Sequence, residues 1–370
     1  METKINLLRS KFGPYLAGLI EGDGTIAIHE NNSKIKKYNP KIILVFKKAD
    51  LPLANYLQNI TKCGTVLIKP ERGYVLWQIQ DIVSIFTIIS IINGFMRTPK
   101  IEALNRAIVW LNNYININKA KFINPPSVSG VSGVSGVACE AGTMDPERIH
   151  PTLPTAGEWS DGLLSSTKLI LLKINILEIK PLDQSPIDRN AWLSGFTDAD
   201  GNFSINIHKR TNKNTTRVQL YYRLEINQNY HKSVAPASPK GLPKGRSCGG
   251  KEQLLDNKEN FFPIISKIGL FLGVTVYSRS RIINDKIYYS FIVKSSNKSS
   301  NSVVCAYFNK YPLLSSKYLD FKDWAYIVKL QNINKLTMSY LDCAIKIRTD
   351  FNKTRTTFVW DHLQFNKDYF

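Results

Sequence analysis

A ten-residue pattern that ends in Asp-Gly occurs twice in the chain, at residues 15–24 and again at residues 192–201. Each copy has an aromatic, an apolar and a small residue, then Gly, two further residues, an acid, a small residue, Asp and Gly, so that Asp23 and Asp200 match. A single Asp-Gly after an apolar helix usually forms only a turn. Two copies with both acids in the same place indicate instead a pair of carboxylates that act together.

Small residues in the middle of each copy predict how the two acids meet. We expect residues 14–21 to form a helix, with Pro14 in its first turn and Gly24 ending it in a left-handed conformation. The small residues would leave one face of each motif helix nearly flat, and two such helices can pack backbone against backbone. The two motif helices should therefore touch and form a domain interface. These small residues are Ala17, Gly18, Ser194 and Gly195.

Two acids placed together at helix ends require a positive partner. The C-terminus of a helix carries a partial negative charge, which disfavours a carboxylate there, and a second carboxylate nearby adds repulsion. A hard divalent cation held by carboxylate and backbone carbonyl oxygens would remove this conflict, and Mg²⁺ or Ca²⁺ suits such ligands. Beside a nucleic-acid backbone, a metal between two acids indicates metal-assisted phosphodiester hydrolysis.

The charge of the chain indicates a polyanionic partner. Its 370 residues include 49 Lys and Arg against 29 Asp and Glu, which gives a net charge of +20. Such an excess favours binding to nucleic acid or to an anionic membrane surface. The excess lies in residues 1–125 and 161–370, whereas residues 126–160 are slightly acidic. This distribution predicts two basic binding domains joined by a connector.

Other classes of protein find no support in the sequence. The most apolar run, residues 82–96, is interrupted by polar residues and is shorter than the roughly 20 residues of a membrane span, so we expect a buried helix. Residues 1–12 lack the features of a secretion or transit signal. The five cysteines form no CxxC pair, and no serine-hydrolase, zincin or P-loop motif occurs. We expect a soluble intracellular protein.

Alternating apolar and polar residues after each motif predict the elements that position the acids. Alternation with a period of two is typical of strands with one buried face. In each half the patterns follow the order helix, hairpin, helix, hairpin, helix, which indicates the α+β class. We expect strands at residues 25–29, 41–47, 73–80, 202–208, 219–228 and 286–294, and helices at residues 53–60, 101–111 and 321–330.

Two low-complexity segments divide the chain. Residues 126–165 contain three Ser-Gly-Val repeats and have little apolar surface, which is typical of a linker. Residues 231–258 include several Pro, Gly and Lys residues, and we expect a surface loop inserted in the second half, whose lysines could also touch a polyanion. The predicted domains are therefore residues 1–125 and residues 166–370.

The two motifs resemble the LAGLIDADG motif, and the layout is similar to that of single-chain homing endonucleases with two such motifs, of the kind encoded in organellar group I introns. Residues 92–100 and 360–363 also resemble segments of this family. The resemblance covers most of both basic blocks, but neither the linker nor residues 233–250. It implies two αββαββα units of the α+β class, whose antiparallel sheets form a saddle over DNA.

The resemblance also implies roles for the motif residues. Asp23 and Asp200 would bind the metal ion, and Gly22 and Ala199, which precede them, would each lend a backbone carbonyl. The implied cofactor is Mg²⁺, and Ca²⁺ could bind without supporting cleavage. The earlier acid of each motif would support a helix end rather than bind metal. These acids are Glu21 and Asp198.

Three further residues match family positions near the metal centres. Lys100 and Lys317 each follow the last hairpin of a half, where a lysine could orient the attacking water or stabilise the developing phosphorane charge. The alternative for each is a phosphate clamp or a plain surface lysine. Gln228 matches a polar residue that helps to position water, and its first-half counterpart is Lys47 or Lys48. Because the counterpart differs, the two metal sites could be unequal in activity.

One face of each predicted sheet is expected to meet DNA. Residues that share the strand parity of the motif acids would point to DNA, with Ile and Phe of opposite parity in the cores. Arg, Gln, Asn and Glu read base edges in the major groove, although a solvated face is the alternative for some of them. Residues 41–47 are mostly apolar, which makes base reading in the first half harder to assign. The candidates are Thr25, Ala27, His29, Lys47, Lys48, Asn202, Ser204, Asn206, His208, Gln219, Tyr221, Arg223, Glu225 and Asn227.

The sequence thus predicts a monomeric, metal-dependent endonuclease that cuts double-stranded DNA at a long, pseudo-palindromic site. An organelle-encoded protein of this kind would act in the mitochondrial matrix. One alternative is an RNA maturase that binds its own intron RNA with the same basic scaffold, and another is a DNA-binding protein that no longer cuts. The presence of both Asp23 and Asp200 favours the nuclease.

Overall fold

Two compact units make up the chain. Residues 1–111 and 177–370 form the first unit, which contains both motifs and both sheets, and residues 112–176 form the second. The predicted linker, the predicted inserted loop and His29 lie outside the described residues, and the predicted domain boundaries stay a prediction. The structure, a computed structural model, describes residues 2–28, 39–123, 174–210, 215–230, 260–333 and 338–365.

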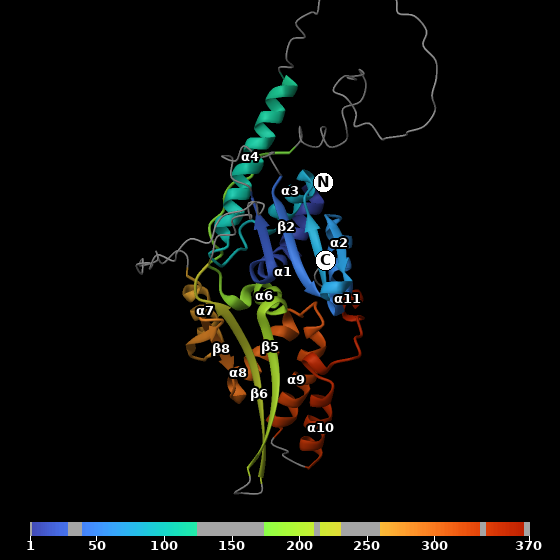
Figure 1. Ribbon diagram of the computed structural model, residues 1–370, viewed down its shortest axis with the longest axis vertical. Helices are drawn as coiled ribbons and strands as arrows, with labels where there is room; N and C mark the ends of the chain where they lie inside the picture. The colour runs from blue at the N-terminus through green and yellow to red at the C-terminus, as the bar shows by residue number, and fades with distance from the viewer. Residues whose placement is uncertain are drawn as a thin grey trace, which may run out of the picture. The chain divides into compact units, whose positions relative to one another are not determined.

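The first half follows the predicted order helix, hairpin, helix, hairpin, helix (Figure 1). Its strands form an antiparallel sheet in the order β1-β2-β4-β3, in which Gly24 pairs with Leu44. The side chain of Asp81 accepts a hydrogen bond from the Ser84 N–H and so begins the third helix. The elements are α1 (Glu2–Asp23), β1 (Gly24–Ala27), β2 (Lys41–Lys47), α2 (Leu51–Thr61), β3 (Thr65–Lys69), β4 (Tyr74–Ile79), α3 (Ile82–Ile92) and α4 (Ile101–Ile123).

The second half repeats this order and adds further helices at its end. Its antiparallel sheet has the order β5-β6-β8-β7, and Gly201 pairs with Leu224 as Gly24 pairs with Leu44. The elements are α6 (Trp192–Asp200), β5 (Gly201–Arg210), β6 (Thr215–Asn227), α7 (Phe262–Leu272), β7 (Val276–Ile283), β8 (Lys286–Ser295), α8 (Lys298–Lys310), α9 (Lys317–Asn332), α10 (Met338–Thr349) and α11 (His362–Phe365).

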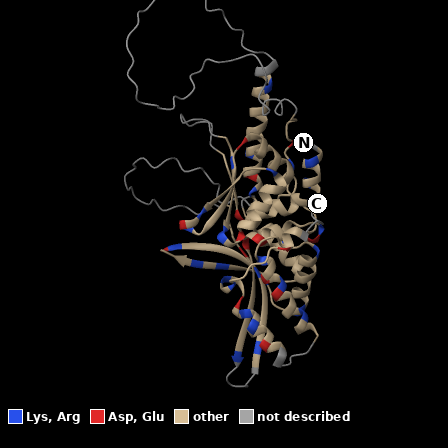
Figure 2. Cartoon of the chain, turned by 90° about the vertical axis from the view of Figure 1, so that its right-hand side faces the viewer, with Lys and Arg blue, Asp and Glu red and all other residues tan. Residues whose placement is uncertain are grey.

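The matching sheet orders confirm the predicted α+β class and the duplicated αββαββα unit. Helices gather on one side of the two sheets (Figure 2). The strand residues that face them are apolar and buried, as the alternation predicted: Ile26 and Ile42 in the first sheet, Phe203 and Tyr222 in the second. The opposite faces carry the exposed and half-buried residues. Each half therefore has its own core, with one sheet face left open.

The first helix begins earlier than predicted. It starts at Glu2, and Pro14 lies in its interior rather than in its first turn. A proline inside a helix costs about 3 kcal/mol. Leu8 and Phe12, on the added N-terminal part, are buried, and burial of two such side chains contributes roughly 3–6 kcal/mol. Packing of this apolar face therefore outweighs the local effect of the proline.

Gly24 does not end the helix in a left-handed conformation, so that prediction is wrong. It is the first residue of β1, and it is not among the described glycines with positive φ. A Cβ atom at Gly24 would lie 2.7 Å from the carbonyl oxygen of Ile20, well inside van der Waals contact. The position therefore requires glycine for space, because the strand leaves the helix directly against its last turn.

The apolar run at residues 82–96 contributes the buried helix α3, as predicted. Within the described part of the chain, no helix is both long and apolar enough to cross a membrane. Cys63, Cys305 and Cys343 are free thiols, and the other two cysteines lie outside the described residues.

Candidate active site

The motif helices α1 and α6 pack against each other with their backbones in contact (Figure 1). A Cβ atom at Gly18 would lie 2.1 Å from the Trp192 carbonyl oxygen, and one at Gly195 would lie 1.9 Å from the Tyr15 carbonyl oxygen. No side chain fits at such distances, so glycine is required at both positions. The predicted interface between the two motif helices is confirmed.

Hydrogen bonds across this interface are exchanged between the motifs. The Trp192 indole Nε1 donates to Glu21 Oε2 at 2.5 Å, and the Tyr15 hydroxyl donates to Asp198 Oδ2 at 2.6 Å. The aromatic residue that opens each motif thus binds the earlier acid of the other motif. Burial raises the pKa of both Glu21 and Asp198, although their hydrogen bonds oppose the shift. These two acids therefore hold the interface between the motif helices, and their predicted support of the helix ends stays a prediction.

The same two acids fix the segments that carry the candidate lysines. Glu21 accepts hydrogen bonds from the backbone N–H groups of Arg97 and Thr98, at 2.9 and 2.6 Å. Asp198 accepts them from Leu314 N–H at 2.7 Å and from the Ser315 hydroxyl at 2.5 Å. Each donor residue lies two or three positions before the lysine of its segment. The interface and the lysine positions are therefore coupled in both halves.

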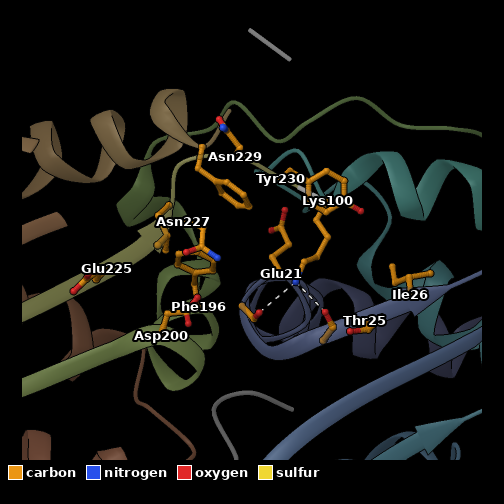
Figure 3. A pocket seen from close by; sticks show the side chains of 14 residues that line it. Glu21, Thr25, Ile26, Lys100, Phe196, Asp200, Glu225, Asn227, Asn229 and Tyr230 are labelled. Atoms are coloured by element: carbon orange, nitrogen blue, oxygen red, sulfur yellow. Dashed lines mark hydrogen bonds between the residues drawn. The ribbon is translucent and has the colours of Figure 1, made fainter. Parts of the chain in front are cut away.

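Lys100 and Lys317 reach the C-terminal ends of the motif helices. The Lys100 Nζ donates to the carbonyl oxygens of Gly22 at 3.2 Å and Gly24 at 2.9 Å (Figure 3). The Lys317 Nζ donates to the carbonyl oxygen of Ala199 at 2.6 Å. An ammonium group there offsets the negative end of the helix dipole. Burial lowers the pKa of both lysines, and the nearby acids partly restore it.

The structure brings the two motif acids together. Gly22 and Ala199, which precede them, face each other across the interface, since a Cβ atom at Gly22 would lie 2.1 Å from Ala199 Cβ and 3.5 Å from Asp200 Oδ2. Loss of solvation and the charge of Asp200 raise the pKa of Asp23 to about 6. Burial raises the pKa of Asp200 as well, against the attraction of the two lysines. The repulsion expected from the sequence is present.

The oxygen atoms between the two motif acids suit a hard cation as ligands. Asp23 and Asp200 offer carboxylate oxygens, and Gly22 and Ala199 offer carbonyl oxygens that also accept from the lysines. A carbonyl oxygen has two lone pairs and can serve both partners. Among the described residues no group of three or more His, Cys, Asp or Glu side chains could hold a metal ion. An oxygen-only site with two carboxylates fits Mg²⁺ or Ca²⁺, which complete their coordination with water or phosphate oxygens.

A cleft of about 400 Å³ opens beside these groups and is lined by both halves. Lys100 lies on its first-half side and Asp200 on its second-half side (Figure 3). Asn227 also lines the cleft, whereas Gln228 does not. The Gln228 amide donates instead to Ser278 Oγ at 2.6 Å. The predicted role of Gln228 in positioning water stays a prediction, and the geometry favours its neighbour Asn227.

The strand register identifies the first-half residues that correspond to Asn227 and Gln228. Because Gly24 pairs with Leu44 and Gly201 with Leu224, Lys48 corresponds to Gln228, and Lys47 to Asn227. The backbone agrees, since Lys48 N–H donates to Gly73 and Gln228 N–H to Tyr289, which are equivalent positions. The two halves therefore differ at this position, with a lysine in one and an amide in the other, and the unequal activity of the two metal sites stays a prediction.

The predicted DNA-facing residues on the described strands lie on the open faces of the sheets, whereas Lys48 lies just after β2 in a short 3-10 helix (Lys48–Asp50). In β6 the buried residues alternate with the candidate residues, so that the two sets occupy opposite faces. Glu225 differs from the others because its carboxylate is engaged by Arg223, Arg281 and the Ser290 hydroxyl. Contact of these residues with DNA stays a prediction. The described candidates are Thr25, Ala27, Lys47, Lys48, Asn202, Ser204, Asn206, His208, Gln219, Tyr221, Arg223, Glu225 and Asn227.

Sequence reasoning missed two sets of residues near the site. Arg279 and Arg281 lie on β7 beside Glu225, and their alternation with serine was a strand signal that could have identified them. Asp50 is buried, and its Oδ1 accepts from the Ser316 N–H at 2.8 Å, next to Lys317. No periodicity marks Asp50, because its partner lies in the other half of the chain.

Comparison with known proteins agrees with this geometry. The model of the family described as LAGLIDADG endonuclease matches residues 16–110, 193–237 and 251–328. The chain is 40% identical over 375 residues to the intron-encoded DNA endonuclease aI3 of Saccharomyces cerevisiae, covering 98% of this chain and 75% of that protein. It is 24% identical to an uncharacterized cox1 intron-2 protein of 37.2 kDa from Schizosaccharomyces pombe, covering 87% of this chain and 68% of the relative.

Solved structures share the fold. The homing endonuclease I-SmaMI bound to cleaved DNA matches with a TM-score of 0.56 at 16% identity, covering 94% of this chain and 99% of that chain. I-GzeII in complex with its DNA target matches with a TM-score of 0.51 at 17% identity, covering 93% and 99%. The duplicated motif, the paired acids at the contact of α1 and α6, and the family match together establish that this chain belongs to the LAGLIDADG endonuclease family.

Proposed function

We propose that this chain is a homing endonuclease that hydrolyses both strands of DNA at one long, pseudo-palindromic site. The observation that carries the proposal is the pairing of Asp23 and Asp200 at the contact of α1 and α6, between two sheets with open faces. The net charge of +20 suits a nucleic-acid partner. The named relative at 40% identity, a DNA endonuclease, supports the same activity.

One chain supplies both halves of the site, so the protein is expected to act as a monomer. Its two halves are related by a pseudo-twofold arrangement, with the same sheet order and the exchanged hydrogen bonds of Tyr15 and Trp192. A duplex offers its two strands with twofold symmetry, and proteins with matching symmetry place equivalent groups on each strand. Each half would therefore present one acid and one lysine to one strand.

The metal is proposed to be Mg²⁺. Asp23, Asp200 and the carbonyl groups of Gly22 and Ala199 would hold it, and Ca²⁺ would occupy the same oxygen donors without supporting cleavage. When bound, a divalent ion activates water and stabilises the charge that develops on a phosphoryl group. The pKa of Asp23, raised first by burial and then by the charge of Asp200, is the feature of this chain that supports such a site.

The lysines would act on the substrate phosphates from fixed positions. Lys100 and Lys317 are held by carbonyl oxygens at the helix ends, and the segments that carry them are fixed by Glu21 and Asp198. A positioned ammonium group can stabilise the growing negative charge on a phosphate oxygen or orient the attacking water. Asn227, which lines the cleft, is placed to hold water by its amide.

The names of the relatives also support an origin in an intron. Two of them are named as intron-encoded endonucleases or as the product of a cox1 intron. We therefore propose that this protein is intron-encoded and acts in the mitochondrial matrix, where the target would be the intronless copy of its host gene.

Two other functions remain as outcomes of the test. A maturase would bind its intron RNA and assist splicing without using Asp23 or Asp200, and a non-cutting DNA-binding protein would bind a target without breaking either strand. Neither is favoured by a specific contact in the structure.

The test is cleavage of a linear duplex that carries the intronless cox1 gene, with Mg²⁺, with Ca²⁺ and with EDTA. We expect discrete cleavage with Mg²⁺ alone, and none for Asp23→Asn or Asp200→Asn, whose DNA binding persists. Asp342→Asn, an exposed acid on α10, is the matched control and should cut normally. Binding without cleavage would indicate the non-cutting DNA-binding protein. Splicing of the cognate intron that is unaffected by Asp23→Asn, without cleavage, would indicate the maturase.

A further inference from the structure

The open faces of the two sheets differ in chemistry although their backbones are duplicates. The register places Ile43 of β2 where β6 has Arg223, and Val45 where β6 has Glu225. Val45 is 45% exposed on the first sheet. If each open face binds one half of the DNA target, the two halves of the target would therefore be contacted by different side chains.

Glu225 is the centre of a cluster of arginines on the second sheet. Its carboxylate forms ion pairs with Arg223 on its own strand and with Arg281 on β7, and Arg279 approaches it at 3.8 Å. The Ser290 hydroxyl donates to Glu225 Oε1 at 2.8 Å. One carboxylate thus holds up to three guanidinium groups, and the cluster keeps an excess of positive charge.

The arginines of this cluster remain open to a ligand. Their side chains are 35–45% exposed, whereas that of Glu225 is 19% exposed. A hollow of about 360 Å³ adjoins them and is lined by Glu225, Arg281 and Tyr288, among others. A guanidinium has five N–H donors, so an arginine that binds a carboxylate retains donors for a second partner.

Guanine is the base that such arginines recognise. Its O6 and N7 accept two parallel hydrogen bonds from one guanidinium in the major groove, which is the commonest specific contact between a side chain and a base. An arginine already held by Glu225 loses less freedom when it binds, and this favours the contact. The Glu225 carboxylate itself is occupied, so its predicted direct contact with a base gives way to a positioning role.

The first sheet offers a different type of contact. Its open face carries Ile43, Val45, Leu67 and Leu76, and Leu67 is 38% exposed. Apolar side chains in the major groove contact the C5-methyl group of thymine. No arginine cluster like that around Glu225 is found on the described strands of the first sheet.

Building on the proposed function, we infer that the target is asymmetric in composition. The half-site on the second sheet carries guanines read by Arg223 and Arg281, with Glu225 as their positioning residue. The half-site on the first sheet is rich in A·T pairs, whose thymine methyl groups contact Ile43 and Val45. The two halves of the target would then resemble each other in spacing but not in base content.

The experiment is selection from a pool of fully randomised DNA duplexes by the full-length protein in EDTA, which prevents cleavage. We expect a consensus with guanines in one half and A·T pairs in the other. For Glu225→Gln, the preference for guanine over adenine at those positions should fall roughly fivefold or more. Affinity for mixed-sequence DNA should not fall, because the variant has lost a negative charge.

Two further variants separate positioning from folding. Arg281→Lys keeps the charge but loses the planar fork, and it should weaken the guanine preference at the same positions. Glu71→Gln removes an exposed acid from the hairpin of the first sheet and should leave the consensus unchanged. Thermal unfolding of each variant verifies that it is folded.

Three outcomes would overturn the inference. A consensus with equal base content in both halves would exclude the proposed asymmetry. Loss of a single cytosine preference in Glu225→Gln, with the guanine positions intact, would show that Glu225 contacts a base directly. Selection that yields no consensus at all would instead refute the proposed site-specific function, so the two failures are distinguishable.

Discussion

Trp192 donates its indole hydrogen to Glu21 at 2.5 Å across the contact of α1 and α6, and the same carboxylate holds the segment that leads to Lys100. Tyr15 and Asp198 repeat the arrangement for Lys317. The contact that joins the two motifs is therefore also the contact that places the two lysines. A change at either aromatic residue is therefore expected to reach the lysine whose segment the same carboxylate holds.

Trp192→Phe and Tyr15→Phe should each destabilise the protein by about 1–3 kcal/mol, because each leaves a buried carboxylate with one hydrogen bond fewer. Chemical denaturation of the metal-free protein measures the effect. Tyr326→Phe, at a half-exposed position, removes a hydroxyl of the same kind and should change the stability little. Equal stability of all three variants would show that the exchanged hydrogen bonds do not hold the interface.

Lys100→Met and Lys317→Met should each slow cleavage roughly 100-fold, since each removes a positive group placed to act on a phosphate. Because each lysine belongs to one half, cleavage of one strand should slow more than that of the other. A nicked product should then accumulate from supercoiled substrate. Lys322→Met, on the exposed side of α9, is the control with the same charge change. Equal slowing of both strands by either variant would argue against separate roles.

The sequence alone was enough to predict the parts that repeat. The duplicated motif located Asp23 and Asp200, and the alternation after it located the strands, because both signals lie within short stretches. The sequence alone could not predict groups that only the strand register brings together, such as Glu225 with Arg281. Their contact requires β6, β8 and β7 to be aligned first. Asp50 and Ser316 are 266 residues apart, and no local pattern connects them. The start of α1 was mistaken because distant packing outweighed the local effect of Pro14.

Asn227 and Gln228 offer a direct test of which side chain serves the cleft. Asn227→Ala should slow cleavage, because Asn227 lines the cleft and Gln228 does not. Gln228→Ala loses its hydrogen bond to Ser278, which should cost about 0.5–1.5 kcal/mol of stability with cleavage retained. The cleavage rate and the free energy of unfolding are measured for both variants and compared. Loss of cleavage in Gln228→Ala alone would instead restore the role expected from the sequence.

Burial of His362 should make the stability depend on pH. Its ring nitrogen Nε2 lies 3.1 Å from the Leu314 carbonyl oxygen, in the segment that Asp198 holds, and burial lowers its pKa below the ordinary value of 6.5. The unfolded chain therefore takes up a proton as pH falls below about 6.5, while the folded protein resists it. The stability that His362 contributes is present at neutral pH and is lost at lower pH.

Denaturation of His362→Gln at pH 7.5 and pH 5 measures this effect. We expect the wild-type protein to lose more stability than the variant between these pH values, whatever the cost of the substitution itself. His208→Gln, at an exposed position on β5, should retain the wild-type pH dependence. Parallel pH profiles for all three proteins would exclude the contribution of His362.

Asp50 gives the most selective test of how one half positions the other. It is buried, and its Oδ1 accepts a hydrogen bond from the Ser316 N–H at 2.8 Å, directly before Lys317. Asp50→Ala would free this N–H and should slow cleavage of one strand, with nicked DNA as the main product. Asp50→Asn keeps an acceptor oxygen of the same reach and should cut far better than the alanine variant. If both variants lose cleavage equally, the charge of Asp50 acts on the site directly, and its hydrogen bond is not the cause.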